Sequence, residues 1–248
     1  MGKRIQKIYH SLISRLIGLV GLFLLVVIST WAYFNIDYQK KNTIENIVEE
    51  VDRLGNTIKL GTHYAMMLNS RDDINEIINN IGRQERIENI RIFNKQGQIK
   101  YSNRAEEVDR VTSIKAEACM ICHKQEPPLE DVDIGQRTRI FPSPGGHRLI
   151  GVISPIYNEP SCSTDACHVH PRDKKVLGAL DVVISLENTD KGIRSYERRI
   201  ILLAIFSFLA TSTIILTFLF LFVNRPIKRL IGQTRLIGKG KFDGSVAT

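Results

Sequence analysis

ENIRIFNKQGQIKYSN, residues 88–103, decides the fold, because apolar and polar side chains alternate along it. A two-residue period is typical of β-strands, and the break at Lys95-Gln96-Gly97 predicts a hairpin there. Further strand candidates follow along the chain, at 137–142 (RTRIFP), 147–157 (HRLIGVISPIY) and 175–186 (KVLGALDVVISL). We therefore expect about five antiparallel strands, in an α+β fold whose helices precede the sheet.

Two helices are predicted upstream of this hairpin. Apolar residues that recur three and four positions apart indicate one face of a long helix, namely Ile44, Ile47, Val51, Leu54 and Ile58. We expect this apolar stripe to suit pairing with a second copy of the chain. A shorter helix is expected over about 74–83, after NSRDD, where Asn69 or Ser70 could provide the N-cap.

Two long apolar runs flank this region, at 16–34 and 200–223, and neither contains a charged residue. Each run is long enough to cross about 30 Å of hydrocarbon as a helix. The first run would also suit a signal peptide, but no small-x-small cleavage site follows in STWAYFNID, so an uncleaved anchor is expected. The chain is thus divided into a short N-terminus at 1–15, two transmembrane helices, an outer domain at 35–199 and a tail at 224–248.

The net charge of +8 belongs to the two ends of the chain. Residues 1–15 carry +4 and residues 224–248 carry +5, which leaves about −1 for everything between them. Basic ends beside two spans place both termini in the cytoplasm and the middle domain outside. Arg198 and Arg199 lie on the outer side of the second span, where their side chains can snorkel at the interface. No basic, aromatic-rich surface remains for binding a nucleic acid.

All four cysteines fall into two pairs, and each pair is followed by a histidine. The first pair is CMICH, which contains Cys119, Cys122 and His123. Two thioether bonds to one haem need two thiols a short loop apart, and the haem iron needs an imidazole beside the second thiol. CMICH has this spacing, so it predicts a covalently bound haem c with His123 as the proximal ligand.

The second pair is CSTDACH, in which four residues rather than two separate Cys162 from Cys167. It predicts a second haem c with His168 as the proximal ligand, although the longer loop is less specific. A local disulfide is an alternative in an oxidising compartment. A structural zinc site built from all four cysteines is another, because zinc favours thiolate ligands. Thiolates outside the inner membrane tend to oxidise, however, and the histidines would have no role in such a site.

The distal iron ligands are expected among the remaining histidines and methionines of the outer segment, since imidazole and thioether both ligate haem iron. These candidates are His63, Met66, Met67, His147 and His170. Only one residue separates His170 from His168, so His170 is expected to serve the other haem or another subunit. Met66 and Met67 lie on the predicted long helix, where a methionine also suits the core. His147 follows PSPGG and also suits a loop.

The outer segment resembles the extracytoplasmic PAS-like, or Cache, domains of bacterial transmembrane receptors. The likeness rests on the helix that leaves the first span, on IRIFNKQGQIKYS at 90–102, and on VLGALDVVISL at 176–186 before the second span. The chain resembles membrane-bound sensor histidine kinases and chemotaxis receptors whose periplasmic PAS-like domain carries c-type haem. PIYNEPSCSTDACHVHP at 155–171, followed by KVLGALDVVISL at 175–186, looks like the haem-bearing kinases in particular. The resemblance implies a bacterial inner-membrane protein with its sensor domain in the periplasm.

The tail is similar to the first helix of a HAMP linker. NRPIKRLIGQTRLIGKGKFDG at 224–244 has Pro226 at a helix start and the pair Gly240 and Phe242 at the end. Its apolar seam consists of Ile227, Leu230, Thr234 and Ile237. Such helices bundle in parallel between two subunits, which implies a homodimer. A basic juxtamembrane helix that binds lipid headgroups is the alternative.

These features lead us to expect a membrane receptor that senses redox state or a small gas through haem and signals through HAMP. No histidine follows His170, so neither a phosphoacceptor nor a catalytic domain is expected within this sequence. The output is expected from a cytoplasmic module or response regulator, as in a sensor histidine kinase. A membrane-anchored dihaem cytochrome that carries electrons between quinol and periplasmic partners is the alternative function.

Overall fold

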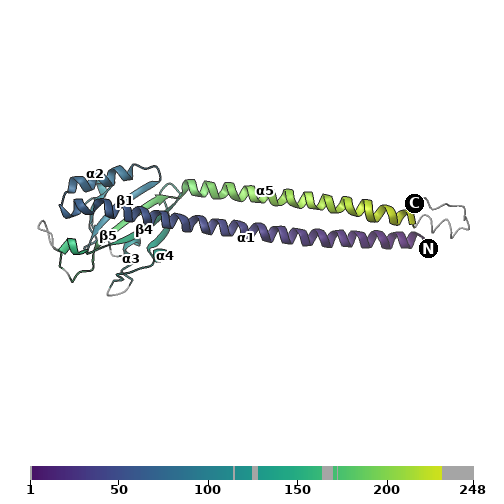
Figure 1. Ribbon diagram of the computed structural model, residues 1–248, viewed down its shortest axis with the longest axis horizontal. Helices are drawn as coiled ribbons and strands as arrows, with labels where there is room; N and C mark the ends of the chain where they lie inside the picture. The colour runs from purple at the N-terminus through teal and green to yellow at the C-terminus, as the bar shows by residue number, and fades with distance from the viewer. Residues whose placement is uncertain (1, 114, 125–127, 164–169, 172, 231–248) are drawn as a thin grey trace, which may run out of the picture. The chain divides into compact units, whose positions relative to one another are not determined.

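The computed structural model describes residues 2–113, 115–124, 128–163, 170–171 and 173–230. The chain forms two compact units. The first unit combines Met1–Gln39 with Arg194–Thr248, and the second is the continuous segment Lys40–Ile193. Two long helices, α1 (Gly2–Met67) and α5 (Glu187–Phe218), contribute residues to both units (Figure 1).

Within the described residues, the second unit contains a five-stranded antiparallel sheet. The order across the sheet is β2-β1-β5-β4-β3, which places β5 in the centre. The strands are β1 (Ile87–Asn94), β2 (Ile99–Ser102), β3 (Thr138–Pro142), β4 (Arg148–Tyr157) and β5 (Val176–Ser185). The expected strands and the α+β class are therefore confirmed.

The β1–β2 hairpin forms because its turn residues satisfy their own backbone groups. The side-chain oxygen of Asn94 accepts hydrogen bonds from the N–H groups of Gln96 and Gln98, at 3.0 and 2.9 Å. The N–H of Gly97 donates to the carbonyl of Asn94, and Gly97 adopts a φ of +73°, which glycine reaches at little steric cost. The break in ENIRIFNKQGQIKYSN is thus a turn, as predicted.

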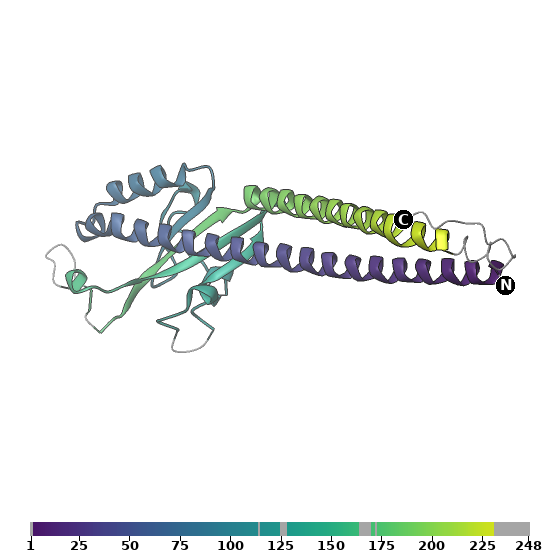
Figure 2. The ribbon, with the colours of Figure 1, turned by 45° about the vertical axis from the view of Figure 1, so that its right-hand side comes forward.

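The C-terminal part of α1 and α2 (Arg71–Gly82) cover one face of the sheet (Figure 2). The apolar stripe of α1 meets alternating strand residues in the main core, whose members include Ile47, Val51, Ile58, Ile90, Ile150, Leu180 and Val182. Ile58 is fully buried there. The expectation that this stripe pairs with a second copy is therefore corrected, because the chain's own sheet already covers it.

A tight turn joins α1 to α2. Asn69 adopts a φ of +52°, and the N–H of Ser70 donates to the carbonyl of Ala65 at 2.9 Å. Ser70 occupies the N-cap position, but its side chain makes no capping hydrogen bond. α2 thus starts close to the expected place, with Asp72 and Asp73 in its first turn, where carboxylates suit the helix dipole.

The other face of the sheet carries the short helices α3 (Glu117–Met120) and α4 (Ile134–Arg137) (Figure 1). A smaller core lies here, and its buried members are Ala118, Ile121, Val132 and Ile153. Two single turns of 3-10 helix, η1 (Ala105–Glu107) and η2 (Pro160–Ser163), belong to the same unit. Both faces of the sheet are therefore covered, each by its own apolar cluster.

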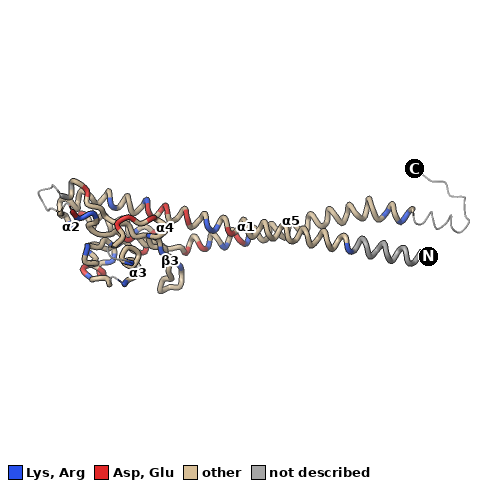
Figure 3. The backbone as a smooth tube through the Cα atoms, turned by 90° about the horizontal axis from the view of Figure 1, so that it is seen from below, with Lys and Arg blue, Asp and Glu red and all other residues tan. Residues whose placement is uncertain are grey.

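The first unit consists of the N-terminal part of α1 and most of α5, followed by the π-helical η3 (Leu219–Asn224) and helical residues through Leu230. By length and composition, α1 and α5 are candidate membrane spans. Figure 3 shows their long stretches without charged residues. The hydroxyl of Tyr196 donates to Oδ1 of Asn35 at 2.5 Å, and both residues border the apolar runs.

Pro226 does not start a new helix, contrary to expectation, because the helix runs through it. Proline has no N–H, and its ring clashes with the carbonyl four residues earlier, here that of Phe222. The preceding residues form the wider η3, in which the N–H of Arg225 donates to the carbonyl of Phe220. The rest of the expected HAMP helix, with Thr234, Ile237, Gly240 and Phe242, lies outside the described residues.

Candidate functional site

The first Cys-His motif forms a single helical turn beside the sheet. The N–H groups of Cys119 and Met120 donate to the carbonyl of Ala116, and the N–H of His123 donates to the carbonyl of Cys119 at 3.1 Å. Residues three positions apart on a helical turn share one side. Cys119, Cys122 and His123 accordingly line one cavity, which we call the first cavity.

The first cavity has a volume of about 420 Å³. Its apolar wall comes from the sheet and the motif segment, through Phe93, Ala118, Leu129, Ile153 and Ala179. Lys95, Lys174 and Lys175 also line it. Cofactor sites of about 300–1,000 Å³ typically combine such apolar walls with a few charged groups. Lys174 and Lys175 pair with Asp173 and Glu130 of the same lining, at 3.8 and 2.7 Å, so the carboxylates of a haem would compete with these acids for the two lysines.

Burial decides the chemistry of the two thiols. It raises the pKa of Cys119, and the nearby Asp181 carboxylate raises that pKa further. Burial also raises the pKa of Cys122, against the opposing effect of Arg137. Both thiols are therefore protonated at neutral pH, and neither is activated as a thiolate nucleophile. This favours attachment of a group over catalysis by either cysteine.

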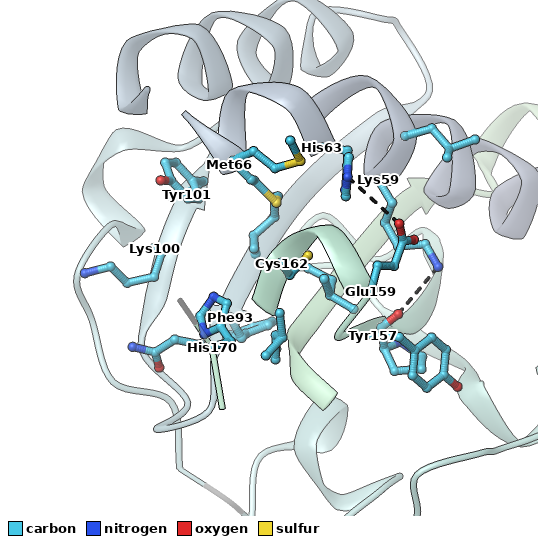
Figure 4. Close-up of a pocket in the computed structure, with 18 of the residues that line it drawn as sticks. Lys59, His63, Met66, Phe93, Lys100, Tyr101, Tyr157, Glu159, Cys162 and His170 are labelled. Carbon is cyan, nitrogen blue, oxygen red and sulfur yellow. Dashed lines mark hydrogen bonds and ion pairs between the residues drawn. The ribbon is translucent and has the colours of Figure 1, made fainter. Parts of the chain in front are cut away.

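A second cavity, of about 500 Å³, brings together most of the remaining candidates (Figure 4). Cys162 lines it from η2, and His170 lines it from the segment after the second motif. The α1 residues of this cavity include His63, Met66 and Met67. In Figure 4 the side chains of His63 and Met66 point from α1 toward the part of the cavity that holds Cys162. Cys167 and His168 lie outside the described residues.

Backbone hydrogen bonds join the described ends of the second motif. The N–H of Cys162 donates to the carbonyl of Glu159 at 2.9 Å, and the N–H of His170 donates to the carbonyl of Cys162 at 3.1 Å. The carboxylate of Glu159 lies 3.9 Å from Nε2 of His63 on α1. The segment that carries the second motif is thus linked to α1 by an ion pair whenever His63 is protonated.

The two cavities lie on opposite faces of the sheet and share a wall. Four residues line both cavities, namely Phe93, Asn94, Pro155 and Gly178. Phe93 pairs with Ala179 and Asn94 pairs with Gly178, and successive side chains of a strand point to opposite faces. A Cβ at Gly178 would collide with the carbonyl oxygen of Phe93, so glycine lets β1 and β5 approach here.

A zinc site shared by the two motifs does not fit this arrangement. Cys119 and Cys122 line the first cavity, whereas Cys162 lines the second, with the sheet between them. In the part of the chain that the structure describes, no group of three or more histidine, cysteine, aspartate or glutamate side chains is placed to hold a metal ion. The described cysteines of the two motifs therefore line separate cavities.

His147 lies apart from both cavities, in the β3–β4 turn. Its Nδ1 is 2.9 Å from Oγ of Ser143, and its carbonyl accepts a hydrogen bond from the N–H of Ser143 at 2.8 Å. Its Nε2 is 3.5 Å from a carboxylate oxygen of Glu88. These contacts stabilise the turn, and they leave His63, Met66, Met67 and His170 as the candidates that face a cavity.

Sequence reasoning missed several charged or polar residues around the cavities. Asp181 in the centre of β5 is fully buried and forms ion pairs with Arg91 and Arg139. The signal for it was present, because Asp181 is the one charged residue in VLGALDVVISL. Lys59 and Tyr101 line the second cavity, where burial lowers the pKa of Lys59 and raises that of Tyr101. Lys59 lies on the predicted long helix and Tyr101 in the predicted hairpin, and the sequence did not indicate that these two elements share a cavity.

The residues of the first cavity fit a covalently attached haem. Two thiols and an imidazole lie on one turn, an apolar wall faces them, and lysines lie at the same cavity. No protein-family model matches the chain, and no curated protein sequence matches it. Function must accordingly follow from the residues and their arrangement.

Proposed function

We propose that this chain is the sensing part of a bacterial inner-membrane receptor that carries haem c in a periplasmic PAS-like domain. The observation that carries the proposal is the single turn on which Cys119, Cys122 and His123 line an apolar cavity. Bound haem would supply an iron centre that changes oxidation state or binds a small gas. The two candidate spans and the basic ends support a receptor that crosses the membrane.

Each motif would hold one haem. In the first cavity, Cys119 and Cys122 would form the thioether bonds and His123 would provide the proximal imidazole. In the second cavity, the corresponding residues would be Cys162, Cys167 and His168. Distal ligands there would come from the side chains that face the same cavity, namely His63, Met66, Met67 and His170.

α1 contacts the surroundings of both cavities, which suits the transmission of a signal. The guanidinium of Arg137 donates to the carbonyl of Val132 at 2.8 Å, and Val132 packs beside Cys122. The same guanidinium donates to Asp52 of α1 at 3.1 Å. His63 of α1 lines the second cavity. A change at either site would therefore favour one position of α1 over another, which is the differential interaction that signalling requires.

A homodimer would receive this signal through HAMP helices. Ile227 and Leu230 are three positions apart on the described helix after η3, as a coiled-coil seam requires. A cytoplasmic output module, such as a histidine kinase acting on a response regulator, would respond to a change in the packing of these helices. The chain itself supplies binding and transmission in this scheme.

A membrane-anchored dihaem cytochrome is the second candidate function. The wall shared by the two cavities supports it, because haems on either side of Phe93 and Gly178 would be separated by one sheet. Such a chain would carry electrons between quinol and periplasmic partners. The apolar seam after the second span has no evident role in that function.

Haem attachment tests both candidates. The full chain, produced in a host that matures c-type cytochromes, should retain two haems after denaturation, because thioether bonds survive unfolding. The pyridine haemochrome spectrum gives the count. Joint replacement of Cys162 and Cys167 by alanine should remove one haem, and joint replacement of Cys119 and Cys122 by alanine should remove the other. A colourless chain that contains zinc would refute the proposal.

Carbon monoxide separates the sensor from the electron carrier. A sensor needs an exchangeable distal ligand, so carbon monoxide should shift the Soret band of the reduced protein. A carrier should keep both irons six-coordinate and show no shift. The carrier replaces the sensor if no shift occurs and if cysteines engineered at 227–230 cross-link equally in oxidised and reduced membranes.

A further inference from the structure

A cluster of three charges, centred on the buried Asp181, lies on the face of the sheet that bears the first cavity. Arg91 donates to Oδ2 of Asp181 at 2.7 Å, and Arg139 donates to both oxygens of Asp181 at 2.8 and 2.9 Å. The side chain of Asp181 is 0 % exposed and that of Arg139 is 8 % exposed. Two cations therefore share one buried anion, and the side chain of Arg91 at the edge of the cluster is 22 % exposed.

The strand register builds this cluster. Arg91 on β1 lies directly opposite Asp181 on β5, and Arg139 on β3 lies opposite Gly151 on β4. A Cβ at Gly151 would come within 2.6 Å of Cζ of Arg139, so the missing side chain lets the guanidinium lie across β4 toward Asp181. The ring of Phe93 lies 5.7 Å from the Arg91 guanidinium, which is the distance of a cation–π contact.

Stability alone gives no reason for such a cluster. Taking charges out of water is costly, and apolar residues of similar volume often replace a buried ion pair without loss of stability. On β4, the residue directly opposite Asp181 is Ile153, a member of the smaller apolar core. A charge kept at this position therefore suggests an electrostatic role toward a neighbouring group.

The neighbouring group is the one expected in the first cavity. Ile153 lines that cavity, as does Ala179, which is two residues before Asp181 on the same face. Phe93 lines it as well and covers Arg91. Residues that line the cavity shared by Cys119, Cys122 and His123 are thus direct neighbours of the cluster.

We propose that the Arg91–Asp181–Arg139 cluster sets the reduction potential of the haem held by Cys119, Cys122 and His123. This inference rests on the proposed function, because it needs haem in the first cavity. A fixed positive charge stabilises reduced iron relative to oxidised iron, which carries one more positive charge, and low-dielectric surroundings strengthen the effect. Each cation of the cluster therefore raises the potential of this haem, and the Asp181 carboxylate lowers it.

Two substitutions should move the potential in opposite directions. Asp181→Asn removes the anion, so the cluster gains positive charge and the potential should rise. Arg139→Gln removes a cation, so the potential should fall. We expect each to change the equilibrium constant for reduction about tenfold, which is 59 mV for one electron. Redox titration of the full chain, followed by the Soret band, measures both shifts.

Three matched variants exclude a purely structural explanation. Arg139→Lys keeps the charge and should leave the potential near that of the wild type. Arg148→Gln removes the same charge at the first residue of β4, where Arg148 pairs with Asp190 instead of Asp181, and should have a smaller effect. Arg91→Gln removes the other cation and should also lower the potential. Circular dichroism checks that each variant is folded. The effect of losing one cation can then be measured even if either Arg139→Gln or Arg91→Gln does not fold.

The outcomes separate this inference from the proposed function. A wild-type chain without covalent haem would refute both. Two haems together with opposite shifts for Asp181→Asn and Arg139→Gln would support the inference. Shifts of the same sign, or an equal shift for Arg139→Lys and Arg139→Gln, would leave the proposed function in place and overturn the role of the cluster.

Discussion

At the scale of single residues, the thiols of the first motif are set by what surrounds them. Cys119 and Cys122 are neither fully exposed nor fully buried. They are accessible from a cavity, yet their pKa values are raised by burial. A pair of neutral thiols beside an apolar wall suits the addition of an apolar ring better than it suits a hydrolytic nucleophile.

This environment makes the reactivity of the haem-free chain depend on pH. At about pH 8 iodoacetamide should alkylate Cys119 and Cys122 more slowly in the folded chain than in guanidinium, because the thiolate is the reactive form. The rate in the folded chain should rise through a midpoint above the usual pKa of 9.0. Mass spectrometry of the peptides gives the rates.

The same shifts predict the sign of a stability change. The unfolded chain loses these thiol protons before the folded chain does, so the thiols' contribution to the free energy of unfolding should fall as the pH rises above 9.0. Equal alkylation rates in the folded and unfolded chains would show that the thiols are not shielded.

At the scale of elements, the two faces of α1 in the second unit differ sharply. Ile58 is 0 % exposed in the core, whereas Leu60, two positions further on, is 68 % exposed. The face that carries Ile58 packs on the sheet. The sequence of the helix alone does not distinguish packing on the sheet from pairing with a second chain, since both bury an apolar stripe.

Replacing these two residues distinguishes the possibilities. Ile58→Ala should lower the free energy of unfolding by about 2–5 kcal/mol, because it leaves a cavity in the core. Leu60→Ala should change it by no more than about 0.5 kcal/mol. Thermal unfolding in detergent, followed by circular dichroism, makes the comparison. If Ile58→Ala instead left stability unchanged and abolished a dimer, the stripe would serve a second copy.

Patterns among neighbouring residues predicted the helices and strands well. Contacts between residues far apart in the sequence could not be predicted in this way. The alternation on either side of Gly97 and the three-and-four spacing from Ile44 to Ile58 each depend on neighbouring residues, so the hairpin and the helix followed from the sequence. The partner of the stripe depends on strands far along the chain. The same is true of Asp181, whose partners Arg91 and Arg139 come from two other strands.

The candidate site divides in the same way. The spacing within CMICH is local, so Cys119, Cys122 and His123 could be singled out together. Which histidines and methionines face a cavity depends on the fold. His63 and Met66 share the second cavity with Cys162 only because α1 packs across the sheet, while His147 is placed in a hairpin turn.

At the scale of the whole molecule, the charge distribution predicts the topology. Trypsin added to intact spheroplasts should cut within 40–193 and spare the basic tail from Arg225 onward, because basic flanks stay in the cytoplasm. Immunoblotting with an epitope at each end follows both regions. Permeabilised cells, in which both regions should be cut, are the control. Cleavage of the tail in intact spheroplasts would reverse the orientation.

The wall between the two cavities also restricts how this protein can evolve. Since successive side chains of a strand point to opposite faces of the sheet, a one-residue insertion in β1, β4 or β5 would move the following side chains to the other face. Such insertions should be eliminated, whereas loops can vary in length. A substitution at Phe93 or Gly178 is exposed to selection from two sites at once. Once both cavities bind a ligand, a substitution in the shared wall that benefits one cavity also changes the other, so the two cavities evolve together.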